Sequence, residues 1–64
     1  MESMRLKVAR DYALSRSEAA HAAAAYRRLP QDFRDIAARE CRAWGELANK
    51  YQQLLEKYNG NTNN

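Results

Sequence analysis

The second half of the chain carries a regular alternation of apolar and polar positions. Such spacing places side chains on one face of an α-helix, in the heptad register of helices that pack side by side. The members of this stripe follow one another at alternating intervals of four and three residues. They are Ala37, Cys41, Trp44, Ala48, Tyr51, Leu55 and Tyr58. Neighbouring side chains widen it, namely Phe33, Ile36, Ala43, Leu47 and Leu54. The pattern predicts a long amphipathic helix over about residues 30–58.

The first half repeats the same spacing, with smaller side chains. Its stripe consists of Val8, Tyr12, Ser15, Ala19, Ala22, Tyr26 and Leu29. This pattern predicts a helix over about residues 4–29. A break stays open as an alternative, because Ser15 and Glu18 have the spacing of a capping box, which starts helices. The alanine-rich sequence on both sides favours an unbroken helix.

One proline separates the two helical patterns. Pro30 is tolerated at the first position of a helix, and Asp32 adds negative charge where the helix dipole favours it. At the far end, Asn59 or Gly60 can close the second helix. We therefore predict an all-α fold, an antiparallel hairpin of two long helices forming a single domain over residues 1–58. Residues 59–64 are predicted to be a flexible polar tail.

In this hairpin the two stripes are expected to face each other and form the core. The alanine run over residues 22–25 would leave room for the indole of Trp44. The expected core residues are Tyr12, Tyr26, Phe33, Ile36, Trp44, Leu47, Tyr51 and Leu54.

A second face of small and apolar residues lies beside the main stripe. Gly45 belongs to it, and a glycine inside a helix costs up to about 1 kcal/mol relative to alanine. It marks either the close approach of another backbone or a tolerated surface position. Two hairpins that meet through this face would make a homodimeric four-helix bundle; the rival is docking on a larger protein. The predicted interface consists of Leu6, Ala9, Ala13, Ala20, Ala24, Ala38, Cys41, Gly45 and Ala48.

Composition agrees with a small helical protein that needs a partner. The chain has 64 residues, 45% of them hydrophobic, but twelve of these are alanine. A chain this short rarely forms a core worth more than about 3–5 kcal/mol. A single cysteine excludes an intramolecular disulfide, and a single histidine argues against a closed zinc site. The chain has no long apolar run and no apolar signal-peptide core, so we expect a cytoplasmic protein without membrane association.

No constellation of catalytic residues stands out. Cys41 is the one candidate nucleophile, but it belongs to the inner stripe, whereas His21 falls on the polar arc of the first helix. Glu40 is the one carboxylate within the apolar stripe, where it could pair with Arg16, with an arginine across a dimer interface, or with water. No phosphate loop or metal motif is present in the sequence. We expect a protein that is not an enzyme and that has no metal, no cofactor and no catalytic residue.

Two functions remain open. The first is a protein-interaction module that acts as a regulator, adaptor or inhibitor of a larger protein through a helical surface. The second is a small basic nucleic-acid-binding regulator. The net charge is +3, all of it from residues 1–29, and Arg5, Arg16 and Arg27 recur every eleven residues. Three helical turns take about 10.8 residues, so these arginines would line one edge of the first helix and track phosphates.

Overall fold

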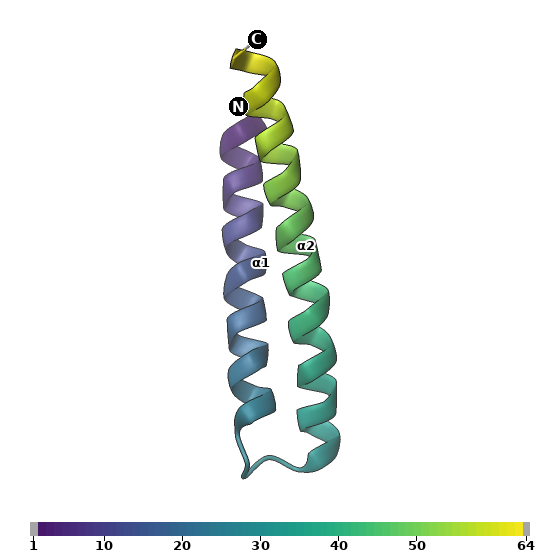
Figure 1. The fold of residues 1–64 in the computed structure, drawn as a ribbon. Coiled ribbons are helices and arrows are strands. Elements are labelled where there is room, and N and C mark those ends of the chain that lie inside the picture. The colour runs from purple at the N-terminus through teal and green to yellow at the C-terminus, as the bar shows by residue number, and fades with distance from the viewer. Residues whose placement is uncertain (1, 64) are drawn as a thin grey trace.

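The protein folds as an antiparallel pair of helices joined by a short connection (Figure 1). The computed structural model describes residues 2–63, so the first residue of the predicted domain and the last residue of the predicted tail lie outside it. Helix α1 spans Glu2–Ala25 and helix α2 spans Gln31–Asn63. No strand occurs within residues 2–63. The predicted all-α hairpin is confirmed, and α1 runs without a break through Ser15.

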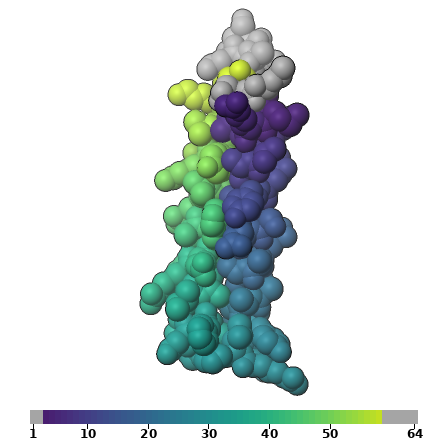
Figure 2. Space-filling view, turned by 180° about the vertical axis from the view of Figure 1, so that it is seen from behind, coloured from purple at the N-terminus to yellow at the C-terminus, as the bar shows by residue number. Residues whose placement is uncertain are grey.

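The hairpin is a single layer of two helices. Its Cα atoms extend over 51 × 14 × 11 Å. Figure 2 shows α1 and α2 side by side from the start of α1 down to the connection. Each broad side of the molecule is therefore a surface two helices wide and about 50 Å long, with no further layer of the described chain over it.

Helix α1 ends at Ala25, earlier than the predicted residue 29. The main-chain N–H of Tyr26 donates to the carbonyl of Ala23 (3.2 Å), a tighter turn than the α-helix makes. The guanidinium Nε of Arg34 then donates to the carbonyl of Ala24 at 3.0 Å. A side chain of α2 thus donates a hydrogen bond to one of the last carbonyls of α1, at the point where the helix ends and the chain reverses direction.

Helix α2 begins where the proline predicts and ends later than predicted. The N–H of Arg34 donates to the carbonyl of Pro30 at 3.1 Å, so the first turn forms directly after the proline. The helix continues to Asn63, beyond the predicted end at residue 58. The described residues contain no glycine with positive φ, so Gly60 does not form the left-handed cap that would close the helix earlier.

The buried residues are small and few. Four hydrophobic residues of the described chain are buried, namely Ala13, Ala37, Ala48 and Leu55. No large side chain among the described residues is completely buried. Two helices that pack through alanines bring their backbones close together. Large side chains then lie at the margins of the contact.

The face of α1 that meets α2 is the one predicted for assembly. Ala13 is buried there, and Leu6, Ala9, Ala20 and Ala24 on the same face are half-buried. Val8, Tyr12 and Tyr26, which were predicted to face α2, are exposed. The prediction of the inner face of α1 is therefore wrong. The physical reason is size, because a stripe of alanines permits closer contact of two backbones than a stripe of tyrosines.

On α2 the predicted inner stripe does face α1. Ala37, Ala48 and Leu55 are buried, and Cys41, Trp44 and Tyr51 are half-buried. The larger residues that flank this stripe are less covered than predicted: Phe33, Ile36 and Leu54 are exposed, and Leu47 is half-buried. One neighbouring helix can cover only a narrow stripe, so the expected core of large side chains is not enclosed within one hairpin.

Candidate functional site

Large apolar side chains are exposed in rows along one broad side of the hairpin. On α1, Ala19 follows Tyr12 at an interval of seven residues, and Val8 lies one turn before Tyr12. Tyr26, the first residue after the end of α1, follows Ala19 at the same interval. A seven-residue interval is close to two turns, so each row stays on one side of its helix. On α2, the corresponding rows are Phe33, Glu40, Leu47 and Leu54, and Trp44, Tyr51 and Tyr58.

Contacts across the hairpin show that the rows of both helices lie on the same side. The rings of Tyr12 and Trp44 meet edge to face, with centroids 5.7 Å apart and planes at 84°. The guanidinium carbon of Arg16 lies 5.7 Å from the centroid of the Trp44 ring. A shallow hollow on this side is lined by Arg16, Ala19, Ala20, Glu40 and Trp44. The hollow thus joins the Tyr12 row of α1 to the Glu40 row of α2.

We call this side the apolar face. Its exposed members are Val8, Tyr12, Tyr26, Phe33, Ile36, Leu54 and Tyr58, each 45–63% exposed. Leu14 and Met4 are also exposed but lie elsewhere on α1, Leu14 on the opposite side and Met4 facing away from α2.

The apolar face contains few charges, and one of them has no partner in the described chain. Glu40 makes no ion pair or hydrogen bond with the residues that the structure describes. Arg16 lies over Trp44 in the same hollow and makes no ion pair with Glu40 there. A cation and a carboxylate therefore sit near each other on the apolar face with their hydrogen-bonding capacity still available.

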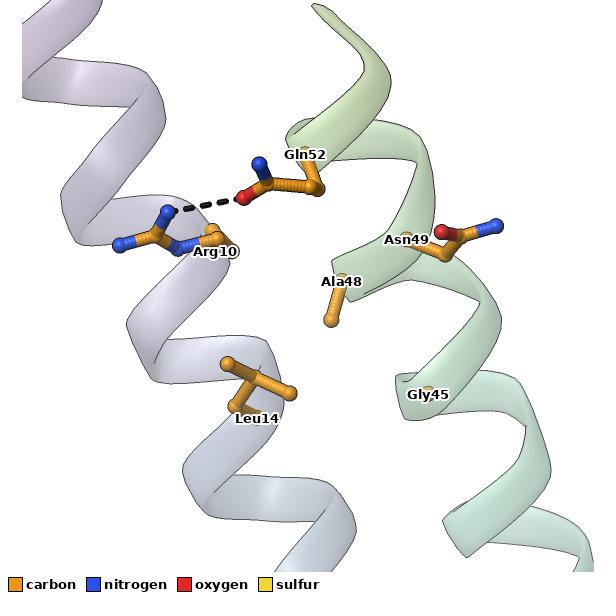
Figure 3. Close-up of a pocket in the computed structure, with 6 residues that line it drawn as sticks. All are labelled: Arg10, Leu14, Gly45, Ala48, Asn49 and Gln52. Carbon is orange, nitrogen blue, oxygen red and sulfur yellow. Dashed lines mark hydrogen bonds between the residues drawn. The ribbon is translucent and has the colours of Figure 1, made fainter. Parts of the chain in front are cut away.

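The opposite side of the hairpin is polar. Its central feature is an open groove of about 260 Å³ between the helices, lined by Arg10, Leu14, Gly45, Ala48, Asn49 and Gln52. Figure 3 shows Arg10 and Gln52 reaching across its upper end, where the guanidinium donates to the Gln52 side-chain oxygen at 2.8 Å. Ala48 points toward α1, whereas Asn49 points away from it (Figure 3). Arg10 also forms an ion pair with Asp11 at 3.0 Å.

Most residues predicted for an interface between chains lie instead between α1 and α2 of one chain. Ala13 and Ala48 are buried there, and Leu6, Ala9, Ala20, Ala24, Cys41 and Gly45 are half-buried; Ala38 is exposed. Gly45 does mark a close approach, but the neighbour is α1 of the same chain. A Cβ built on Gly45 would lie 3.5 Å from the Ser17 hydroxyl, an ordinary van der Waals contact. The glycine is therefore a contact position within the hairpin.

The three arginines predicted to form a basic edge do not share one helix. Arg5 and Arg16 lie on α1, whereas Arg27 lies in the connection after α1 ends. Arg16 is in addition placed over the indole of Trp44. The structure therefore brings two of the predicted arginines onto one helix and separates the third from their row.

The candidate groups for chemistry are not brought together. Cys41 is half-buried and faces Ser17, with 3.6 Å between the sulfur and the hydroxyl oxygen. His21 is exposed on the opposite, polar side of the hairpin. Within the part of the chain that the structure describes, no group of three potential metal ligands occurs. No helix in the described chain combines the length and the apolar character needed to cross a bilayer.

The chain matches no family model, no curated protein and no solved structure.

The sequence analysis identified the residues of the apolar face but was wrong to place them in the core of one hairpin. Tyr12, Tyr26, Phe33, Ile36 and Leu54 were expected to be enclosed within one hairpin and are exposed. A signal for this was present in the sequence. A continuous stripe of alanines runs along one side of α1, and two helices approach each other most closely through such a stripe. The bulky residues beside it are then left outside the contact.

Proposed function

We propose that this protein is a non-catalytic helical protein-interaction module, a regulator, adaptor or inhibitor of a larger protein, and that the apolar face is a protein-binding surface. The observation that carries the proposal is the gathering of seven large, exposed apolar side chains on one side of the hairpin. Exposed apolar residues scattered singly need no explanation, but a contiguous patch of several hundred Å² marks an interaction site.

The size of the apolar face supports binding to a macromolecule. A large side chain offers about 200 Å² when fully exposed, so seven of them about half exposed leave on the order of 700 Å². Stable protein interfaces bury about 600–1,000 Å² on each partner. The apolar face therefore has the area of a complete protein interface.

The weakness of the hairpin core supports the same function. The described chain buries only four hydrophobic residues, three of which are alanine. Buried alanine contributes little to stability, since each buried methylene is worth about 0.8 kcal/mol. A hairpin of this kind gains most of its apolar burial when a partner covers the apolar face, so binding and folding are expected to be coupled.

Position-specific photocrosslinking in cells that make the chain tests the proposal. A photoreactive residue at Leu54 samples the apolar face, and the same residue at Leu14 samples the polar side. Both positions carry leucines of similar exposure, 50% and 44%, so they form a matched pair. We expect protein adducts from position 54 and few from position 14. Equal yields from both positions would show that the apolar face is not the binding surface.

The alternative is a small nucleic-acid-binding regulator, supported by the net charge of +3. For this function, binding to a generic duplex would weaken steeply with salt. Reversing the charge of Arg5 and Arg27, which lie outside the hollow beside Trp44, would then abolish it. If binding has these properties and position 54 yields no protein adducts, the alternative replaces the proposal.

A further inference from the structure

The residues of the apolar face also indicate which partner covers it. We propose that the occupant is a second copy of this chain, and that two hairpins form a two-fold symmetric four-helix bundle in which Arg16 of each copy pairs with Glu40 of the other. This inference rests on the proposed function, because it names the partner of the same surface.

The first argument is the amount of surface. About 700 Å² of exposed large side chains on one hairpin lies within the range that each partner buries in a stable dimer. Two such hairpins that meet face to face would cover both apolar faces completely. The result is the second layer that a bundle core requires, since the single hairpin is only one helix thick.

The second argument is charge. The hollow on the apolar face contains Arg16 and Glu40, which make no ion pair with each other in one chain. A two-fold axis makes each contact occur twice, because residue i of one copy meets residue j of the other and j meets i. A face with a cation and a carboxylate at neighbouring positions is therefore complementary to itself, and both charges gain partners on association.

The third argument is the size of the hairpin core. A chain that buries three alanines and one leucine depends on a partner for its folded state. A second copy is present wherever the chain is made, and in the same amount. Homodimers whose monomers are not stably folded arise in this way.

The test begins with the mass of the purified chain over a dilution series, measured by sedimentation equilibrium. We expect a species of twice the chain mass of 7.4 kDa that dissociates on dilution, with helicity lost in parallel. Leu54→Lys should raise the Kd of self-association about tenfold or more, because it places a charge in the bundle core. Leu14→Lys on the polar side should change the Kd less than about twofold.

Charge variants test the pairing of Arg16 with Glu40. A mixture of two variants also distinguishes loss of this pairing from failure to fold. Arg16→Glu alone and Glu40→Arg alone should each weaken self-association by about tenfold, since each variant places like charges opposite each other. An equimolar mixture of the two variants restores two complementary pairs, and it should form a mixed dimer. The matched control is Arg42→Glu with Glu18→Arg, which are exposed on the polar side and should leave the mass unchanged.

The outcomes separate this inference from the proposed function. A purified chain that stays helical at 7.4 kDa at all concentrations overturns the second copy as occupant. If position 54 then still yields crosslinks to a different protein, the proposed function stands; if it yields none, both fail. A dimer that is weakened equally by Leu54→Lys and Leu14→Lys uses another surface, and a variant mixture that associates no better than its components rules out the Arg16–Glu40 pairing.

Discussion

The hydroxyl of Ser17 donates a hydrogen bond of 3.0 Å to the main-chain carbonyl of Cys41, which joins α1 to α2 near the middle of the hairpin. The same hydroxyl lies 3.5 Å from the place where a Cβ on Gly45 would be. A small polar side chain thus fills the space over a glycine and binds the neighbouring helix. This local fit aligns the alanine faces of the two helices.

Removing this hydrogen bond should weaken the hairpin modestly. Ser17→Ala is expected to lower the free energy of unfolding by about 0.5–1.5 kcal/mol, the net value of a typical hydrogen bond in a protein. Thermal unfolding followed by circular dichroism at one fixed chain concentration would measure the change. Ser15→Ala is the control, because Ser15 is exposed and should have an effect below about 0.5 kcal/mol. Equal effects of both substitutions would mean that the Ser17–Cys41 bond adds nothing to stability.

Gly45 should accept one methyl group and no more. Gly45→Ala is expected to stabilise the protein by about 0.5–1 kcal/mol, since alanine is the better helix former and its Cβ meets only the Ser17 hydroxyl at contact distance. Gly45→Leu would push α1 away from α2 and should destabilise the protein by about 1–3 kcal/mol. Urea titration of both variants checks the opposite signs. Destabilisation by alanine would show that α1 lies closer to Gly45 than described.

The alanine contact between the helices should not tolerate larger side chains. Ala13 is buried against α2, so Ala13→Leu should cost about 1–3 kcal/mol by overpacking. Ala22 is exposed on the same helix, and Ala22→Leu should be close to neutral. A comparison of the two variants by chemical denaturation distinguishes the buried face of α1 from its exposed face. The opposite ranking would restore the arrangement in which Tyr12 and Tyr26 face α2.

Arg34 is expected to hold the end of α1. Its guanidinium donates to the Ala24 carbonyl at 3.0 Å, and its positive charge favours the C-terminal end of the helix dipole. Arg34→Ala should lower stability by about 1 kcal/mol and speed hydrogen exchange of the last turn of α1. Arg39→Ala removes the same charge from an exposed position on α2 and serves as the control. If exchange in the last turn is equally fast in both variants, the capping contact is absent in solution.

The candidate site could be predicted from the sequence in its members but not in its position. The bulky residues Tyr12, Tyr26, Phe33, Ile36 and Leu54 stand out by their spacing alone. Their spacing places them on one side of each helix, but periodicity contains no information about which neighbour covers that side. Glu40 was recognised as a carboxylate within an apolar stripe, and the structure adds that Arg16 lines the same hollow.

Two helices that reverse at Pro30 could be predicted without a structure. Residues that break helices are few, apolar residues recur with helical spacing, and one proline interrupts them. The stripe of α2 that faces α1 could also be predicted, because alanines and Leu55 recur along it with heptad spacing. The face of α1 that meets this stripe became clear only from the packing of the two helices. Two helices in contact gain most where their backbones approach closest, so the alanine face of α1 is buried and its tyrosine row is left exposed.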